Sequence, residues 1–139
     1  MKPESPKRPN HLIGMRGVYL VAAEPTRRGF IVAPTSRSAI GADLLVTDLR
    51  CRKAWSVQVK TSERQDAYFL MSKNAKELAS DSHIYVFVSF KRRGVHRPPD
   101  FLVAGSHVVA KKTRVDGSWY AFDRANADRG GWRLFGSPN

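Results

Sequence analysis

The chain contains little cysteine and no long apolar segment. Cys51 is the only cysteine among 139 residues, so no disulfide can form within the chain, and we expect a reducing, cytoplasmic location. The apolar stretches, such as residues 84–90, are much shorter than the roughly 18 residues that a membrane-spanning helix requires. No apolar segment follows the basic residues at the N-terminus, so we also expect no signal peptide.

Acidic residues are scarce as well. The chain has 12 Asp and Glu against 24 Lys and Arg, which gives a net charge of +12. A positive excess of this size favours a polyanionic partner, either a nucleic acid or an anionic membrane surface. The sequence has no lipid-facing amphipathic helix with a basic polar face. The charge therefore indicates nucleic acid.

Several common site motifs are missing. The chain has no Gly-x-Gly-x-x-Gly and no Walker-type Gly-Lys-Ser/Thr sequence, which argues against a nucleotide-hydrolysing enzyme. Its four histidines have neither the spacing nor the cysteine partners of a zinc site, so we expect them at the surface or at helix ends. Cys51 has no adjoining histidine and is expected in a turn rather than as a nucleophile.

The length fits one compact domain, residues 10–139, preceded by a short arm. Residues 1–9 hold three prolines and three basic residues without apolar periodicity, which predicts a flexible arm. In the whole chain 42% of the residues are hydrophobic, enough to close a core without disulfides.

The pattern after the arm predicts a mixed α/β domain. Apolar residues at helical spacing predict a helix that begins with Asn10 as its N-cap and stops or kinks at Glu24, because Pro25 cannot donate a hydrogen bond. Further helices are predicted at residues 72–80 and 106–111, and strands at residues 30–33, 42–48, 55–61, 84–90 and 101–103. The strand at 84–90 is apolar on both faces and is expected at the centre of the sheet. The aromatic segment after residue 118 has no regular period.

Asp43, Gln58 and Lys60 form the polar group with the clearest chemistry. Gln58 and Lys60 share one face of a strand because their positions differ by two. If residues 49–53 form a hairpin turn, Asp43 lies at the level of these two side chains. A carboxylate and an amide oxygen suit Mg²⁺, and a lysine beside the cation can orient or deprotonate a water that attacks phosphorus.

This group resembles the active-site core of the PD-(D/E)XK nuclease superfamily, the fold of many restriction enzymes and archaeal Holliday-junction resolvases. In that family an α-β-β-β-α-β core carries an Asp at the start of the second strand and an acid-x-Lys tripeptide on the third. Asp43 matches the first position, and Gln58-Val59-Lys60 matches the tripeptide with Gln in place of the acid, a variant known in some homing endonucleases. The resemblance covers residues 10–90.

The resemblance implies a restriction-endonuclease-like α/β fold, with a central mixed sheet flanked by helices. It also implies a DNA endonuclease that depends on Mg²⁺ or Mn²⁺ and acts as a homodimer on duplex or branched DNA. Asp43, Gln58 and the backbone carbonyl of Val59 would bind the metal, and Lys60 would handle the attacking water.

Two features depart from the family pattern. The acid that the first helix often supplies is expected near Val18 and Tyr19, yet Glu24 is the only acid in that helix, so we include Glu24 as a candidate metal ligand. Gln58 also removes one formal charge, which weakens metal binding. The alternatives are a catalytically degenerate nucleic-acid-binding module, a subunit of a larger DNA defence or repair complex, an RNA-associated basic domain, or an ordinary half-exposed hairpin.

Basic side chains gather in the predicted turns and helix ends. Such residues bind the phosphate backbone and carry no base specificity by themselves. Two hydroxyl residues that follow Lys60 are candidates for the same role. The candidate nucleic-acid-binding residues are Arg27, Arg28, Arg37, Arg50, Arg52, Lys53, Thr61, Ser62, Lys91, Arg92 and Arg93.

Overall fold

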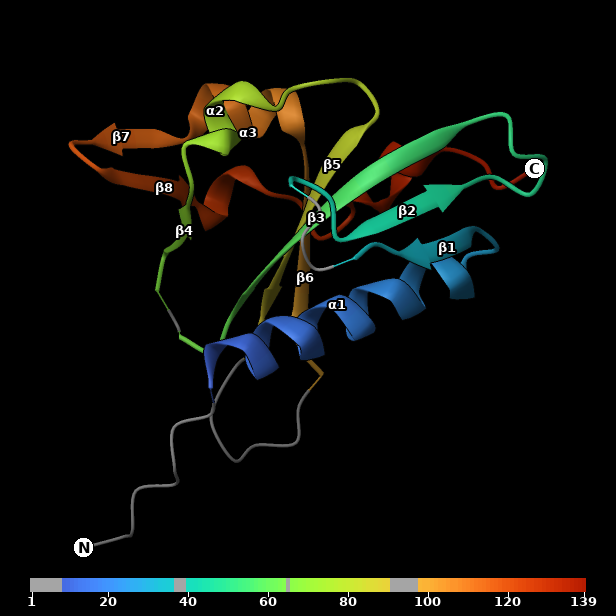
Figure 1. Ribbon diagram of the computed structural model, residues 1–139, viewed down its shortest axis with the longest axis horizontal. Coiled ribbons are helices and arrows are strands. Elements are labelled where there is room, and N and C mark those ends of the chain that lie inside the picture. The colour runs from blue at the N-terminus through green and yellow to red at the C-terminus, as the bar shows by residue number, and fades with distance from the viewer. Residues whose placement is uncertain (1–8, 37–39, 65, 91–97) are drawn as a thin grey trace, which may run out of the picture.

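The main element of the fold is a five-stranded mixed sheet (Figure 1). The computed structural model describes residues 9–36, 40–64, 66–90 and 98–139, so the arm up to residue 8, Arg37 and the basic residues 91–93 lie outside the described residues. The strands lie in the order β1 (Ile31–Pro34), β2 (Leu44–Thr47), β3 (Ala54–Ser62), β5 (His83–Ser89) and β6 (Asp100–Gly105). The β3–β5 pair is parallel and the other pairs are antiparallel.

A long helix, α1 (Asn10–Arg27), covers one face of this sheet (Figure 1). The strand residues that alternate toward α1 form a single apolar core, into which the helix inserts Val21. Gly17 is the point of closest approach, because a Cβ at that position would lie 2.9 Å from the Cβ of Thr61 on β3. Residues after the last strand complete the same core with Trp132 and Phe135 from the 3₁₀ turn η2 (Gly131–Phe135).

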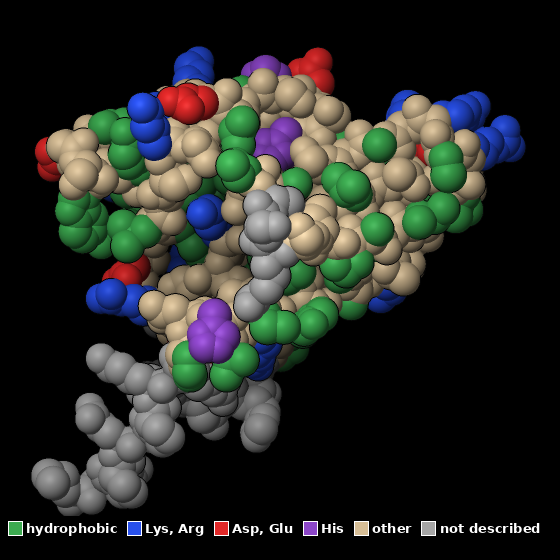
Figure 2. All heavy atoms as spheres, in the orientation of Figure 1, with side chains coloured by type: hydrophobic (Ala, Val, Ile, Leu, Met, Phe, Trp, Pro, Cys, Tyr) green, Lys and Arg blue, Asp and Glu red, His purple; other side chains and the backbone are tan. Residues whose placement is uncertain are grey.

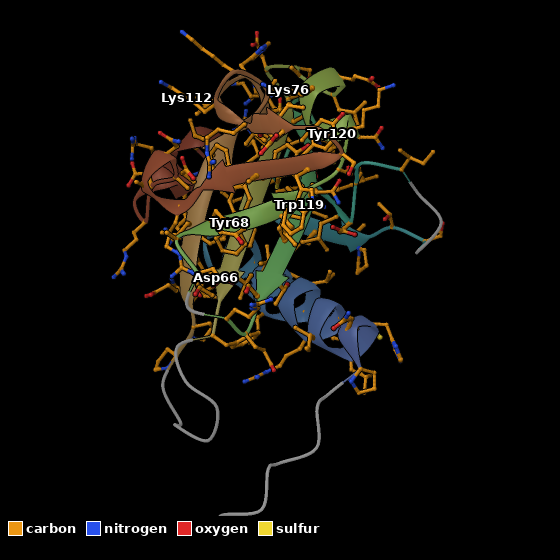
Figure 3. All side chains as sticks on the ribbon, turned by 90° about the vertical axis from the view of Figure 1, so that its left-hand side faces the viewer. Asp66, Tyr68, Lys76, Lys112, Trp119 and Tyr120 are labelled. Atoms are coloured by element: carbon orange, nitrogen blue, oxygen red, sulfur yellow. The ribbon has the colours of Figure 1, made fainter. Side chains whose placement is uncertain are left out.

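A second, smaller sheet covers part of the opposite face. Its strands lie in the order β4 (Tyr68–Met71), β8 (Trp119–Asp123) and β7 (Arg114–Asp116). Two short helices, α2 (Asn74–Glu77) and α3 (Ser106–Lys112), pack beside it, and the turn η1 (Arg124–Asn126) follows β8. Figure 3 shows Tyr68, Trp119 and Tyr120 on this sheet, with Lys76 and Lys112 on the helices above it.

A second apolar core joins the two sheets. Phe69 and Phe122 of the small sheet pack against Phe87 of β5, with ring centroids 4.9 Å from Phe87 in each case. Tyr85 of β5 and Val109 of α3 belong to the same core. The face of the main sheet that carries Gln58 and Lys60 is therefore bounded by the small sheet and its helices.

The observed elements follow the predicted order but differ in detail. The first helix continues through Pro25 to Arg27, and its N-cap is Pro9 rather than Asn10. The strand at 83–89 is buried throughout, as its apolar sequence predicts, but β3 and not β5 is the middle strand. The helix predicted at 72–80 shortens to Asn74–Glu77. None of the described helices has the length and apolar character needed to cross a membrane.

Candidate active site

The β2–β3 hairpin brings the three predicted site residues to one end of the hairpin. Leu44 pairs with Val57 in the antiparallel register, and Asp43 lies one residue before this pair, at a bend that precedes β2. The Asp43 backbone N–H donates to the Val57 carbonyl at 2.8 Å, which holds this bend against β3. Strand alternation places Gln58 and Lys60 on one face of β3, and Asp43 lies at the edge of the strand beside Val59, the residue between them.

The Asp43 carboxylate is held by the neighbouring strand. Its Oδ2 accepts a hydrogen bond from the backbone N–H of Val59 at 2.7 Å. Because β2 begins only at Leu44, no strand residue pairs with Val59 on this side of β3, and the side chain of Asp43 takes that place. In an extended strand the N–H and C=O of one residue point to the same side. The Val59 carbonyl is therefore directed to the same edge as the Asp43 carboxylate.

Lys60 lies in a partly buried position beside this carboxylate. Burial lowers the pKa of the Lys60 ammonium below its ordinary value of 10.5, while the negative charge of Asp43 acts in the opposite direction and raises it. The net direction is downward, because the loss of solvation outweighs the attraction. Figure 2 shows a hollow between the small sheet and α1, on the side of the molecule turned to the viewer. Lys60 is therefore poised for proton transfer more readily than a solvated lysine.

A cavity of about 570 Å³ lies beside Asp43, between the N-terminal half of α1 and the segment that links β1 to β2. Val18 of α1, the position where the resemblance leads us to expect an acid, lines this cavity together with Asp43 and Val59. We call it the Asp43 cavity. The helix thus approaches the candidate site at the expected place but presents an apolar side chain to it.

Glu24 is not part of this arrangement. Its carboxylate forms ion pairs with Arg27 at 2.9 Å and with Arg28 at 3.6 Å, near the C-terminal end of α1. The residues of α1 that line the Asp43 cavity all precede Leu20, toward the other end of the helix. The prediction of Glu24 as a metal ligand is therefore not supported by its position. Among the described residues, no group of three or more His, Cys, Asp and Glu side chains could hold a metal ion.

The basic hairpin turn lies far from Asp43. Arg50, Arg52 and Lys53 are exposed at the opposite end of the β2–β3 hairpin, and basic side chains gather over this turn in Figure 2. Six residues of extended chain separate Asp43 from the turn, which corresponds to about 20 Å. The turn itself is organised by Asp48, whose Oδ1 accepts hydrogen bonds from the backbone N–H groups of Arg52 at 2.7 Å and Lys53 at 3.2 Å.

The hydroxyl residues after Lys60 are engaged within the protein. The Thr61 side chain faces Gly17 of α1, with its Oγ1 buried. The Ser62 Oγ accepts a hydrogen bond from the backbone N–H of Arg64 at 3.0 Å. Thr61 is therefore turned away from the face that carries Lys60, and its buried hydroxyl has no hydrogen-bond partner among the described residues.

One neighbour of this site was not predicted. His83, expected at the surface or at a helix end, is buried at the start of β5, and its Nδ1 lies 2.6 Å from the Oγ of Ser56. Burial lowers the pKa of this imidazole, and the hydrogen bond to Ser56 acts against that shift. Ser56 precedes Gln58 and Lys60 on the same face of β3, so a polar row runs along this strand. The even spacing of residues 56, 58 and 60 predicts this row on β3, whereas the place of His83 beside it depends on the pairing of β5 with β3.

Comparisons with known proteins give one result about architecture. No protein-family profile and no curated protein match this sequence. Among solved structures, the fold is similar to that of Hjc, a Holliday junction resolvase from the archaeal hyperthermophile Archaeoglobus fulgidus, with a TM-score of 0.57. The likeness covers 87% of this chain and 99% of that chain at 10% sequence identity.

The fold is restriction-endonuclease-like. At such low identity the likeness establishes the fold alone. It agrees with the element order predicted for residues 10–90, in which β2 and β3 carry the candidate site. The function has to be argued from the side chains at that site.

Proposed function

We propose that this protein is a metal-dependent DNA endonuclease that hydrolyses phosphodiester bonds at the Asp43, Gln58 and Lys60 site. The observation that carries the proposal is the Asp43 carboxylate, fixed by the Val59 N–H at 2.7 Å beside a lysine whose pKa is lowered by burial. A fixed acid that lines a cavity, next to an amine whose pKa is lowered, is a typical arrangement for acid–base chemistry. The restriction-endonuclease-like fold supports the same reading by analogy.

The residues present fit a hard divalent cation. The Asp43 carboxylate, the Val59 backbone carbonyl and the Gln58 side-chain oxygen are all oxygen donors, which Mg²⁺ and Mn²⁺ accept. Mg²⁺ retains several waters and needs few protein ligands, so a set with a single carboxylate is chemically sufficient. When bound, the cation would offset the negative charge that develops on the phosphoryl oxygens.

The other half of the chemistry belongs to Lys60. Because its pKa is lowered, the neutral amine is formed more easily than in a solvated lysine, and the neutral amine accepts a proton. Lys60 takes the proton of the attacking water while the water oxygen forms its bond to phosphorus and the bond from phosphorus to the leaving sugar oxygen breaks. The leaving oxygen takes a proton from solvent water. The ammonium that results remains next to the Asp43 carboxylate, which stabilises its charge.

The partner proposed for this site is duplex or branched DNA. The net charge of +12 supplies the attraction to a polyphosphate backbone. A chain of this size covers little of a duplex, and we propose a homodimer, in which two sites cut two strands. We propose the cytoplasm as the location, on the single cysteine.

One observation favours a second candidate function. Val18 lines the Asp43 cavity where an acid would add a metal ligand, and Gln58 lacks the charge of Asp or Glu. A protein with these two features and the same basic charge would bind DNA without cutting it, alone or as a subunit of a larger defence or repair complex. This second function predicts DNA binding that weakens steeply with salt and no measurable heat of metal binding.

Cleavage assays distinguish the two functions. The purified protein is incubated with plasmid DNA and with a four-way junction, in Mg²⁺ or Mn²⁺, alongside the Asp43→Ala and Lys60→Ala variants. The proposal expects cleavage by the natural protein, loss of about 10²-fold or more in both variants, and normal rates in Lys111→Ala, which removes an exposed cation of α3. Cleavage that persists in Asp43→Ala and Lys60→Ala contradicts the proposal.

A further inference from the structure

We propose that the Asp43 cavity holds one unpaired nucleobase of the bound DNA, next to the phosphodiester at the candidate site. This inference rests on the proposed function and deepens it by naming the substrate class. DNA with a base already free of its partner, such as a branch point, a fork or a mismatch, is the substrate that such a cavity selects. Perfect duplex would have to lose base pairing and stacking first.

The cavity has the size and position for such a ligand. Its volume of about 570 Å³ lies within the range of small-molecule pockets, about 300–1,000 Å³. Asp43 and Val59 form its boundary with the candidate site, so a group that enters the cavity is adjacent to these residues. A nucleotide beside the scissile phosphate can therefore place its base there.

The walls suit a flat aromatic ring. Met15, Val18 and Pro34 supply apolar surface. Tyr19, whose side chain is 62% exposed, supplies an aromatic ring for stacking. Base–aromatic stacking is tolerant of sequence, because every base presents a π-face. These walls would receive the faces of a base of any identity.

The polar groups suit the edge of a base rather than a phosphate. The described lining residues include no lysine or arginine, and Asp43 is their only acid. Among these described residues, a phosphate would meet the negative charge of Asp43 with no cation to offset it. A base is neutral, and its amino groups can donate to the hydroxyl oxygen of Thr35, which lines the cavity and itself donates to the Ala42 carbonyl at 2.6 Å.

A substitution at Gly14 can fill the cavity and so test the proposal. It lies on the cavity wall in α1, and a Cβ at this position would meet no atom within 4 Å. A leucine at position 14 therefore projects into open space, fills part of the cavity and leaves the backbone of α1 in place. Ala23, which is exposed on the same helix outside the cavity, gives a matched control as Ala23→Leu.

The experiment measures the affinity of forked DNA by fluorescence anisotropy, in EDTA so that no strand is cut. Each unpaired nucleotide near the fork is replaced in turn by an abasic nucleotide. We expect one position where the abasic fork binds about tenfold more weakly, the loss of one stacked base. In Gly14→Leu we expect the intact and the abasic fork to bind equally, at the affinity that the natural protein has for the abasic fork. In Ala23→Leu we expect the difference of about tenfold between the two forks to remain. Urea unfolding confirms that both variants are folded.

Three outcomes overturn this inference alone. The first is a wild-type affinity that no abasic substitution changes, and the second is a Gly14→Leu protein that still distinguishes base from abasic. The third is an equal loss of affinity for both DNAs in Gly14→Leu, which would place backbone rather than a base in the cavity. Metal-dependent cleavage together with any of these leaves the proposed function standing, whereas absence of DNA binding in the natural protein overturns both.

Discussion

The carboxylate of Asp43 and the backbone N–H of Val59 are joined across two strands by a hydrogen bond of 2.7 Å. This bond aligns a side chain at the start of β2 with the residue that separates Gln58 from Lys60 on β3. The orientation of the acid is thus set by the backbone of the strand that carries the lysine. Charge-assisted bonds of this kind are stronger than neutral ones, so the geometry is fixed before any ligand arrives.

The first prediction concerns the titration of Lys60. Burial lowers the pKa of Lys60 below 10.5 in the natural protein, and the negative charge of Asp43 opposes this decrease. Asp43→Asn keeps the shape of the side chain and removes the charge, so we expect the pKa of Lys60 to fall further. The measurement is an NMR titration of the side-chain signal of Lys60, assigned through Lys60→Arg. An unchanged or raised pKa in Asp43→Asn would show that the two groups do not interact.

The second prediction concerns the contact between α1 and β3. Gly17→Ala places a Cβ 2.9 Å from the Cβ of Thr61, so we expect the free energy of unfolding to fall by about 1–3 kcal/mol, as in other overpacked cores. Gly14→Ala on the same helix meets no atom within 4 Å and should raise it by about 0.5–1 kcal/mol, because alanine favours the helix more than glycine does. Urea denaturation measures both.

The opposite signs make the pair of glycine variants informative. If both substitutions stabilise the protein, helix propensity dominates and the close approach at Gly17 is relieved by a small shift of α1. In that case the double variant Gly17→Ala, Thr61→Ala would show no additional gain. If the contact is real, Thr61→Ala removes the hydroxyl and methyl groups that face position 17 and restores part of the lost stability.

The third prediction concerns the missing acid. Val18 lines the Asp43 cavity, so Val18→Glu places a second carboxylate near Asp43. We expect the affinity for Mg²⁺ or Mn²⁺ to rise about tenfold, which corresponds to about 1.4 kcal/mol. Isothermal titration calorimetry measures it. Val18→Gln is the control, because it has the same length without the charge.

Glu24 provides the comparison for this experiment. Its carboxylate is paired with Arg27 and Arg28, away from the Asp43 cavity. Glu24→Gln should therefore leave metal affinity unchanged. A rise in affinity with Val18→Gln as large as with Val18→Glu, or a loss with Glu24→Gln, would mean that the metal binds elsewhere.

The fourth prediction concerns Asp48 and acid stability. Burial raises the pKa of this carboxyl, but hydrogen bonds from Lys53 and Arg52 and the charges of these two residues lower it more, so the net pKa falls below 3.8. A lowered carboxyl pKa stabilises the fold fully above the unfolded value, and this contribution disappears as the pH falls through the folded value. The benefit of Asp48 is therefore present above pH 3.8 and lost below it.

Thermal unfolding of Asp48→Ala tests this sign. The difference in Tm between the natural protein and the variant should be constant near neutral pH and should shrink as the pH is lowered below about 4. Asp116→Ala, at an exposed position of β7, is the control. A difference that grows in acid would contradict the assignment.

The sequence was a good guide where local patterns decide structure. The β2–β3 hairpin could be predicted because alternating apolar residues on both sides of a cationic turn leave one register that buries Leu44 and Val57 together. That register determines the position of Asp43 relative to Gln58 and Lys60. The strand at 83–89 could also be predicted, because its sequence is apolar on both faces. The structure buries every residue in it.

Other elements depend on contacts that are remote in sequence. β4 is four residues long and gains its hydrogen bonds from β8, which lies about fifty residues later, so its own pattern is too short to predict it. α1 continues through Pro25 because a proline near a helix end removes one donor without ending the last turn, where Thr26 Oγ1 donates to the Ala22 carbonyl at 2.8 Å. The burial of His83 follows from the pairing of β5 with β3, which periodicity does not reveal.

In the sequence, β4 is translated between β3 and β5, although it belongs to the other sheet. This order has a consequence for synthesis on the ribosome. All five strands of the main sheet have been translated once Gly105 is reached, but β8, the strand that pairs with β4, is still absent. Until Phe122 is added, the aromatic face of Phe69 and Phe87 lacks its third ring. A nascent chain that pauses between Gly105 and Phe122 exposes the apolar surface of Phe69 and Phe87. A chaperone or a second nascent chain would contact this surface before β8 covers it.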